Sequence, residues 1–447
     1  MAGMNELGSQ TFQCIHKKKI KLLVTNSRTK GIVKGEIKVT QATSTNEIVI
    51  IEEGGVTLPK GYKAGGLHCG IKRKRLDLGY IVSEVPATAA GVYTTNIFQA
   101  APLLVTQESI SKEFKIQSII VNSGNANACT GEQGLKDAFE MQKAFADKLG
   151  IKEHLVAVTS TGVIGEIMPM DKVEAGIKQI LNKEHENEDN FMQAILTTDT
   201  CVKHTAVQFK IDGKTISIGG ASKGSGMVHP NMATMLGFVT TDANIEQEDL
   251  LAALRDVTNQ TFNMITVDGD TSTNDMVLVM ANGLAENNQL SKDHPEWNIF
   301  KQGLKIVCES LAKKIARDGE GATKLVEVQV NSAYSQNAAS AVGKAIISSN
   351  LVKTAIYGTD PNWGRIVTAI GYSGVPVEPN TVKVAIGPFT VFEHGLPSNF
   401  IEEEVKGYLE SENVKLSVEL NQGEYSATAW GCDLTYDYVK INASYRT

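Results

Sequence analysis

The stretch KGSGMVHPNMATMLGF, from Lys223 to Phe238, carries the most information about this chain. It places Thr234 directly after the small residue Ala233, and two glycines and one proline precede it in this stretch. Glycine reaches backbone conformations that are closed to other residues, and threonine, being β-branched, has few side-chain rotamers. A threonine held in such a turn can attack the carbonyl group of the residue before it. If the resulting ester is hydrolysed, Thr234 becomes the first residue of a new chain.

The freed α-amine of Thr234 would have a pKa near ~8, which suits it to accept the hydroxyl proton at neutral pH. Nucleophile and base would then lie on one residue, as in enzymes with an N-terminal threonine. Taken alone, a Gly- and Met-rich stretch with one threonine is more often a buried turn. His229, five residues earlier, is a candidate base, but the α-amine makes it unnecessary and we assign it a role in the loop.

Length and composition narrow the class of protein. The chain has 447 residues, more than one core usually supports, so we expect two or three domains. Hydrophobic residues make up 42% and charged residues 21%, as in ordinary soluble globular proteins. A net charge of −7 argues against nucleic acid or a membrane as the main partner, and no apolar run approaches the ~20 residues of a membrane span. Six separated cysteines without a CxxC pair predict reduced thiols and a cytoplasmic location.

Motifs of several other catalytic classes are missing from the sequence. HExxH does not occur, which disfavours a zinc hydrolase, and GEGATK lacks the GK[ST] of a phosphate loop. The acids Asp268, Asp270 and Asp275 suggest a metal site at first sight. A calcium loop beginning at Asp268 would need Gly and Glu where the chain has Thr273 and Val279. We therefore expect a hydrogen-bonded turn, no metal and no cofactor.

Several blocks, in one order from about Gly54 to Thr447, resemble the ornithine acetyltransferase (glutamate N-acetyltransferase) family. The segment from Lys223 to Phe238 resembles the self-cleavage site of that family. The other blocks are NSGNANACTG from Asn122, TSTGVIG from Thr159, TTDT from Thr197, DGDTSTND from Asp268, GEGATK from Gly319, LVKTAIYGTDPNWGRI from Leu351 and the terminal INASYRT. The resemblance implies an α+β fold, namely a layered α/β/β/α sandwich with a smaller strand-rich C-terminal domain. It also implies that both cleavage products stay together in an α₂β₂ heterotetramer.

The resemblance also assigns roles to individual residues. It makes Thr234 the nucleophile, with cleavage between Ala233 and Thr234, and makes Thr161 and Gly162 the oxyanion hole. The implied substrate-binding residues are Thr200, Lys223, Thr234, Glu320, Asn442 and Thr447. By pattern alone, the Thr-Gly pair is a turn at the end of a strand, Lys223 a solvated loop residue and Thr200 a helix cap. Glu320 stands between two glycines and is the natural counter-charge for the amine of ornithine.

The implied reaction transfers acetyl from N-acetylornithine to glutamate through acetyl-Thr234, in the cyclic pathway of arginine biosynthesis. Some members of the family also use acetyl-CoA as donor, and no residue in the sequence decides this point. One rival is a self-processing aminopeptidase or amidohydrolase, in which water takes the acyl group. Another is a ligand-binding protein that keeps the fold without catalysis. Acetate release, or an intact 447-residue chain, would favour these rivals respectively.

Periodicity and composition divide the chain into three parts. Residues 1–36 contain seven basic residues and lack the family pattern; we expect a dispensable extension, either from an early translation start or, as the alternative, a transit peptide. Residues 37–324 form the predicted catalytic domain, and 325–447 a C-terminal domain whose tail reaches the active site. Apolar spacing predicts helices at 135–149, 247–260 and 300–317. Predicted strands are 119–121, 155–160, 276–280, 325–330 and 381–386.

Overall fold

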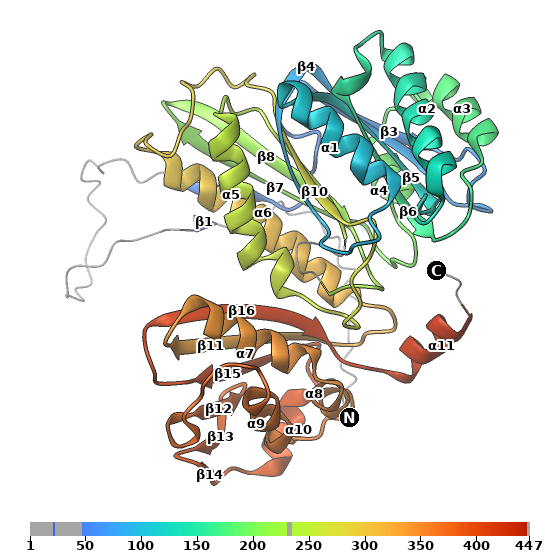
Figure 1. Ribbon diagram of the computed structural model, residues 1–447. Helices are drawn as coiled ribbons and strands as arrows, with labels where there is room; N and C mark the ends of the chain where they lie inside the picture. Colours follow the sequence, from blue (N-terminus) through green and yellow to red (C-terminus); the bar gives the residue numbers. More distant parts are fainter. Residues whose placement is uncertain (1–20, 23–46, 230–234, 445–447) are drawn as a thin grey trace, which may run out of the picture.

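The computed structural model describes residues 21–22, 47–229 and 235–444. Ala233, Thr234 and Thr447 therefore lie outside the described residues. The larger of two sheets has ten strands, in the order β1-β2-β7-β8-β9-β10-β4-β5-β6, with β3 beside β4 (Figure 1). Its strands are β1 (Lys21–Leu22), β2 (Ile48–Ile51), β3 (Tyr62–Leu67), β4 (Leu78–Tyr93), β5 (Lys115–Asn125), β6 (Val156–Val163), β7 (Lys203–Ile211), β8 (Lys214–Lys223), β9 (Leu236–Thr241) and β10 (Met276–Ala281).

The long strand β4 divides this sheet into two halves that pack face to face. Its end near Tyr93 pairs with β10, whereas its beginning pairs with β3 and β5, and the register with β5 shifts between Val82 and Ala87. Side chains from both halves, such as Val121 of β5 and Phe238 of β9, share one buried cluster. The two halves are therefore separate layers.

Helices cover the outer face of each half. Six helices belong to this part of the chain: α1 (Ala101–Glu113), α2 (Gly131–Leu149), α3 (Met170–Gln179), α4 (Glu188–Ala194), α5 (Gln247–Gln260) and α6 (Trp297–Arg317). Helices α5 and α6 pack on the half that contains β9 and β10, and Leu254, Leu311 and Val277 belong to one buried cluster. Helices α2 and α3 cover the other half, where Phe145 and Ile120 belong to another buried cluster. The layers follow the order α/β/β/α, which confirms the expected fold.

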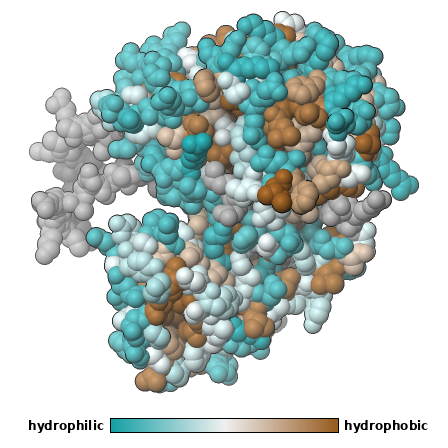
Figure 2. Space-filling model, viewed as in Figure 1, coloured by the Kyte–Doolittle hydropathy of each residue, from teal (hydrophilic) through white to brown (hydrophobic). Residues whose placement is uncertain are grey.

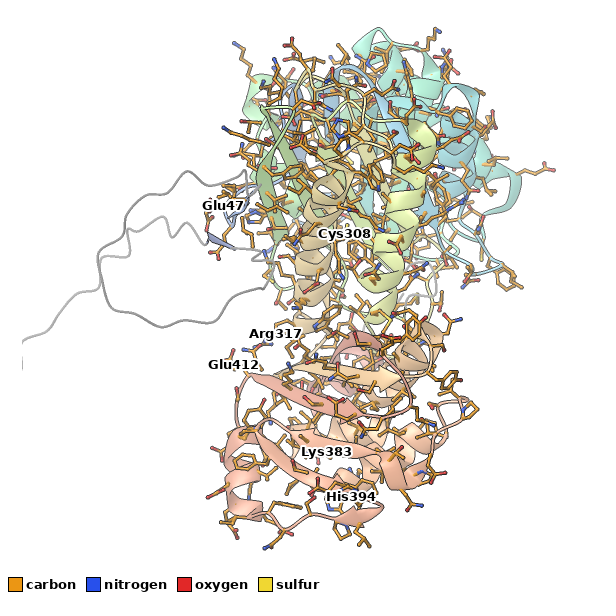
Figure 3. The ribbon with its side chains drawn as sticks, turned by 90° about the vertical axis from the view of Figure 1, so that its left-hand side faces the viewer. Glu47, Cys308, Arg317, Lys383, His394 and Glu412 are labelled. Carbon is orange, nitrogen blue, oxygen red and sulfur yellow. The ribbon has the colours of Figure 1, made fainter. Side chains whose placement is uncertain are left out.

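A second sheet of six strands is formed entirely after residue 324, in the order β14-β13-β12-β15-β11-β16. Its elements are β11 (Leu325–Ala333), α7 (Gln336–Ser348), α8 (Asn350–Tyr357), α9 (Trp363–Gly371), β12 (Lys383–Ile386), β13 (Phe389–Glu393), β14 (Leu396–Pro397), α10 (Glu402–Leu409), β15 (Asn413–Glu419), β16 (Tyr425–Cys432) and α11 (Tyr436–Ser444). Helix α6 reaches this sheet, and Arg317 at its end lies 3.2 Å from the Glu412 carboxylate, between the two bodies (Figure 3).

The predicted elements exist, but several of them begin at other residues than predicted. Helix α5 spans the predicted 247–260, whereas α2 and α6 begin before the predicted 135 and 300. Apolar spacing marks only the buried face, and the first turn of each of these two helices is largely polar or half-exposed. The strand predicted from 381 begins at Lys383, because Pro379 opens a short 3₁₀ turn that ends at Thr381.

The face of the molecule that Figure 2 shows is mainly hydrophilic. In the ranges described, no helix combines the length and apolar character that crossing a bilayer requires.

Candidate active site

A cavity of about 190 Å³ lies where the ends of β6 and β8 and the start of β9 meet Glu320 and the C-terminal helix α11. Among the residues that line it are Thr161, Gly162, Lys223, Glu320 and Asn442. These five are the predicted oxyanion pair and three of the predicted substrate-binding residues, and they come from four separate segments of the sequence. The structure thus brings together residues that the sequence places up to 281 positions apart (442 − 161).

Strand pairing explains why both ends of the segment from Lys223 to Leu236, which contains the predicted cleavage site, border this cavity. This stretch is called the processing segment. Strands β8 and β9 are antiparallel, and Lys223 at the end of β8 pairs with Leu236 at the start of β9. Both ends of the intervening segment are therefore held side by side. Met235, the residue after the predicted nucleophile, lines the cavity and accepts a hydrogen bond from the Met276 amide (3.1 Å). The predicted role of Thr234 itself remains a prediction from the sequence.

The predicted oxyanion pair stands at the end of β6. Gly162 packs so closely on Gly124 of β5 that a Cβ atom would lie 2.3 Å from the Gly124 carbonyl carbon. Its φ of 139° also lies in the region that favours glycine. Packing therefore requires glycine at position 162, a reason that the sequence did not reveal. The Lys223 ammonium group donates to the Thr161 hydroxyl over 3.4 Å.

A buried ion network fixes the strand end that carries Lys223. The Lys203 ammonium group lies 2.7 Å from Asp199 and 2.5 Å from Asp318, and its side chain is fully buried. Asp199 also accepts a hydrogen bond from the Gly224 amide (2.7 Å). Burial opposes ionisation of Asp199, but Lys203 and Lys223 outweigh it and hold the pKa of this carboxyl far below its usual value. Burial would likewise lower the pKa of Lys203, yet its two carboxylate partners raise it.

Glu320 meets the processing segment and the C-terminal helix at one point. Its carboxylate accepts a hydrogen bond from the Asn442 side chain of α11 (2.7 Å), and its amide donates to the Ser225 carbonyl (2.9 Å). A Cβ atom on Gly226 would lie 2.4 Å from the Glu320 carboxyl carbon. Glycine is required at position 226 because the carboxylate approaches the backbone there. The Glu320 carboxylate therefore stands on the cavity wall, where Asp268, Asp270 and Asp275 also lie.

Thr200 is the described candidate that the cavity does not include. Its side chain is exposed, and its amide (3.1 Å) and hydroxyl both donate to the Asp318 carboxylate. Thr197 and Thr198, from the same TTDT block, line the cavity instead. The block offered three threonines within four residues and no periodicity to choose between them. The assignment of Thr200 to substrate binding stays a prediction, and the positions of Thr197 and Thr198 make them alternative candidates for that contact.

A pair of substitutions separates these threonines. Thr197→Val is expected to raise the KM for the acyl donor by roughly ten-fold, because a buried polar contact to substrate would be lost. Thr200→Val is expected to change KM less than two-fold, as its hydroxyl bonds Asp318. Steady-state kinetics of both purified variants checks this, with melting curves as a control for folding. The reverse order would restore Thr200 as the substrate contact.

The acidic turn after β9 and α5 has two parts with different surroundings. Asp268 accepts hydrogen bonds from the amides of Met227 (2.7 Å) and Val228 (2.8 Å), so it anchors the backbone that leads into the processing segment. Asp275 lines the cavity and is only 4% exposed. Burial raises the pKa of Asp275 well above its usual value, although nearby Lys223 opposes the shift. Sequence analysis treated both acids as one structural turn and missed the separate position of Asp275.

His229 lies beside the turn. Its Nδ1 atom is 3.0 Å from the Thr266 hydroxyl, and burial lowers its pKa. It does not line the cavity, in keeping with the loop role that we expected. A search of residues 21–22, 47–229 and 235–444 finds no group of three His, Cys, Asp or Glu side chains arranged to hold a metal ion.

Comparisons with known proteins identify the family of this chain. The model of the ArgJ family matches residues 63–447. The arginine biosynthesis bifunctional protein ArgJ of Oceanobacillus iheyensis is 60% identical over 407 residues, which cover 91% of this chain and 100% of that protein. The protein of the same name from Bacillus subtilis is 55% identical over 404 residues, or 90% of this chain and 99% of that protein.

Two solved structures are also similar. The arginine biosynthesis bifunctional protein argJ from Bacillus halodurans is 59% identical, with a TM-score of 0.47; the match covers 47% of this chain and 100% of that one. An ornithine acetyltransferase complexed with ornithine, from Mycobacterium tuberculosis, is 36% identical, with a TM-score of 0.39; here 42% of this chain and 100% of that one are covered. With a family match over most of its length and relatives at 55–60% identity, the chain belongs to the ArgJ family.

Proposed function

We propose that this protein is a glutamate N-acetyltransferase of arginine biosynthesis, which transfers acetyl from N-acetylornithine to glutamate and also accepts acetyl from acetyl-CoA. The observation that carries the proposal is the convergence of Thr161, Gly162, Lys223, Glu320 and Asn442 on one cavity beside Met235. The names of the relatives, arginine biosynthesis bifunctional proteins, support both the pathway and the second activity. An enzyme with this activity is expected in the cytoplasm.

The charges of the cavity match the charges of the proposed donor. N-acetylornithine carries an α-carboxylate and a cationic side-chain amine. Lys223 offers a cation and Glu320 an anion on the cavity wall, so each charged end of the donor has a partner of opposite sign. Glutamate shares the α-carboxylate, and Lys223 can therefore hold the two substrates in turn.

The pair at the end of β6 suits the developing oxyanion. Because Lys223 donates to the Thr161 hydroxyl (3.4 Å), the hydroxyl hydrogen of Thr161 remains available to donate in its turn. A positive charge beside this hydroxyl strengthens that second hydrogen bond. Together with the Gly162 amide, it would stabilise the tetrahedral intermediate formed when the Thr234 hydroxyl attacks the acetyl carbonyl. The acetyl-threonine then splits one difficult exchange into two easier steps.

Kinetics and mass spectrometry test the proposed intermediate. A shared acetyl-Thr234 requires parallel double-reciprocal lines when N-acetylornithine and glutamate are varied. It also requires one acetyl mass increment on the Thr234 fragment when glutamate is withheld. Intersecting lines without an adduct would indicate direct transfer in a ternary complex. Release of acetate in place of N-acetylglutamate would favour the amidohydrolase.

We further propose that the two cleavage products assemble as an α₂β₂ heterotetramer. The two parts of the chain share the ten-stranded sheet, since β8 precedes the proposed cleavage point and β9 follows it. Cleavage would therefore leave a continuous set of backbone hydrogen bonds between the products. Native mass spectrometry should find two copies of each fragment in one particle. A particle with one copy of each would contradict the tetramer.

A further inference from the structure

Four consecutive basic residues, Lys72, Arg73, Lys74 and Arg75, lie in the loop between β3 and β4. Lys72 donates to the Leu196 carbonyl (2.8 Å), and Arg75 donates to the carbonyls of Thr197 (2.9 Å) and Asp199 (3.3 Å). Thr197 itself lines the cavity. The basic segment is thus tied directly to the backbone that forms one cavity wall.

The same segment also lies beside the oxyanion pair. The Lys72 side chain packs on Gly124, since a Cβ atom there would be 2.8 Å from Lys72 Cγ. Gly124 in turn packs on Gly162, which lines the cavity. If the carbonyl oxygen of a bound acyl donor faces Gly162, the remainder of the donor molecule would therefore lie close to the basic segment.

The three exposed charges of this segment have no salt-bridge partner in the part of the chain that the structure describes. Arg73, Lys74 and Arg75 are exposed, and no carboxylate of residues 47–229 or 235–444 forms a salt bridge with any of them. Burial, together with the nearby charges of Arg75 and Lys223, lowers the pKa of Lys72 to about 8, although Asp77 opposes the shift. A bound anion would relieve this repulsion. The chain as a whole has a net charge of −7. We therefore interpret this local concentration of positive charge near the cavity as a binding site for an anionic ligand.

We propose that the exposed side chains of Arg73 and Lys74 bind the phosphate groups of acetyl-CoA when it serves as acyl donor. This inference rests on the proposed function, which includes acetyl-CoA as a donor. The cavity of about 190 Å³ is smaller than the ~300–1,000 Å³ of pockets that hold drug-sized ligands, so the nucleotide must lie outside it. The flexible pantetheine arm lets the thioester enter the cavity while the phosphates stay on the rim. Arginine and lysine are the usual partners of phosphate oxygens.

The chemical step is balanced with this donor. The Thr234 hydroxyl oxygen bonds to the acetyl carbon, the carbon–sulfur bond breaks, and the hydroxyl proton passes by way of the α-amine to the departing sulfur. CoA leaves as the free thiol. The amine of glutamate then attacks the acetyl-threonine ester and returns a proton to the threonine oxygen. Only the first donor differs from the reaction with N-acetylornithine.

The double variant Arg73→Gln/Lys74→Gln tests the proposal. Its KM for acetyl-CoA is expected to rise by roughly ten-fold or more, and its kcat/KM for N-acetylornithine to change by less than two-fold, because that donor has no phosphate. With S-acetylpantetheine, which lacks the nucleotide phosphates, wild type and variant are expected to give the same KM. The matched control is Lys210→Gln/Lys406→Gln, which removes two exposed charges from residues that do not line the cavity.

Several results would overturn the proposal. Equal KM values for acetyl-CoA in wild type and variant would do so, as would equal KM values for acetyl-CoA and S-acetylpantetheine in the wild type. If the variant loses binding to DNA or to anionic vesicles while its acetyl-CoA kinetics stay normal, the segment serves a polymer or a membrane instead. A wild type that transfers acetyl from N-acetylornithine but never from acetyl-CoA removes the second donor and this site together. A wild type inactive with both donors overturns the proposed function itself.

Discussion

Replacing Thr234 with alanine is expected to leave a single chain of 447 residues that has no acetyl-transfer activity. Alanine has no hydroxyl group, so neither the ester of self-cleavage nor the acetyl intermediate can form. The wild type should give fragments of 233 and 214 residues (447 − 233), and N-terminal sequencing of the smaller one should read TMLGF. A denaturing gel and a transfer assay measure both effects. This is the largest change that we predict, because one substitution removes the nucleophile of two reactions.

A matched variant shows whether the effect belongs to position 234. Thr215→Ala removes the same hydroxyl group from an exposed position at the start of β8. It is expected to be processed and active. Thr234→Ser, which keeps a hydroxyl, should cleave at a measurable rate. Processing of Thr234→Ala at the same bond would exclude Thr234 as the attacking residue.

The resemblance to the family predicted the layers of the fold, whereas local patterns in the sequence predicted individual helices and strands. The predicted bounds of helix α5 and strand β10 lie close to the observed ones, because each element has a continuous buried face. The candidate site residues were predicted from motifs that resemble those of the family, and five of them, from distant blocks of the sequence, line one cavity. Such convergence depends on the whole chain folding, which no single segment of the sequence reveals.

Interactions between distant segments could not be predicted in the same way. Lys203 carries no local sequence signal, yet it is buried between Asp199 and Asp318, which are four and 115 residues away. The sequence likewise gives no sign that the approach of Glu320 requires glycine at position 226. Pattern analysis detects periodic burial and local backbone needs. It does not detect which charges meet across the fold.

Thr161→Ala is expected to slow self-cleavage and acetyl transfer alike, each by ~10²–10³-fold, the usual cost of losing one oxyanion donor. Both reactions pass through a tetrahedral oxyanion, and the Thr161 hydroxyl is polarised by Lys223 at 3.4 Å. Thr161→Ser, which keeps the hydroxyl, should recover most of both rates. Asn442→Ala provides the contrast, because Asn442 contacts Glu320 and is assigned to substrate alone: it should be processed normally and show a raised KM. If Thr161→Ala slows transfer but cleaves at the wild-type rate, Thr161 binds substrate and the oxyanion is stabilised elsewhere.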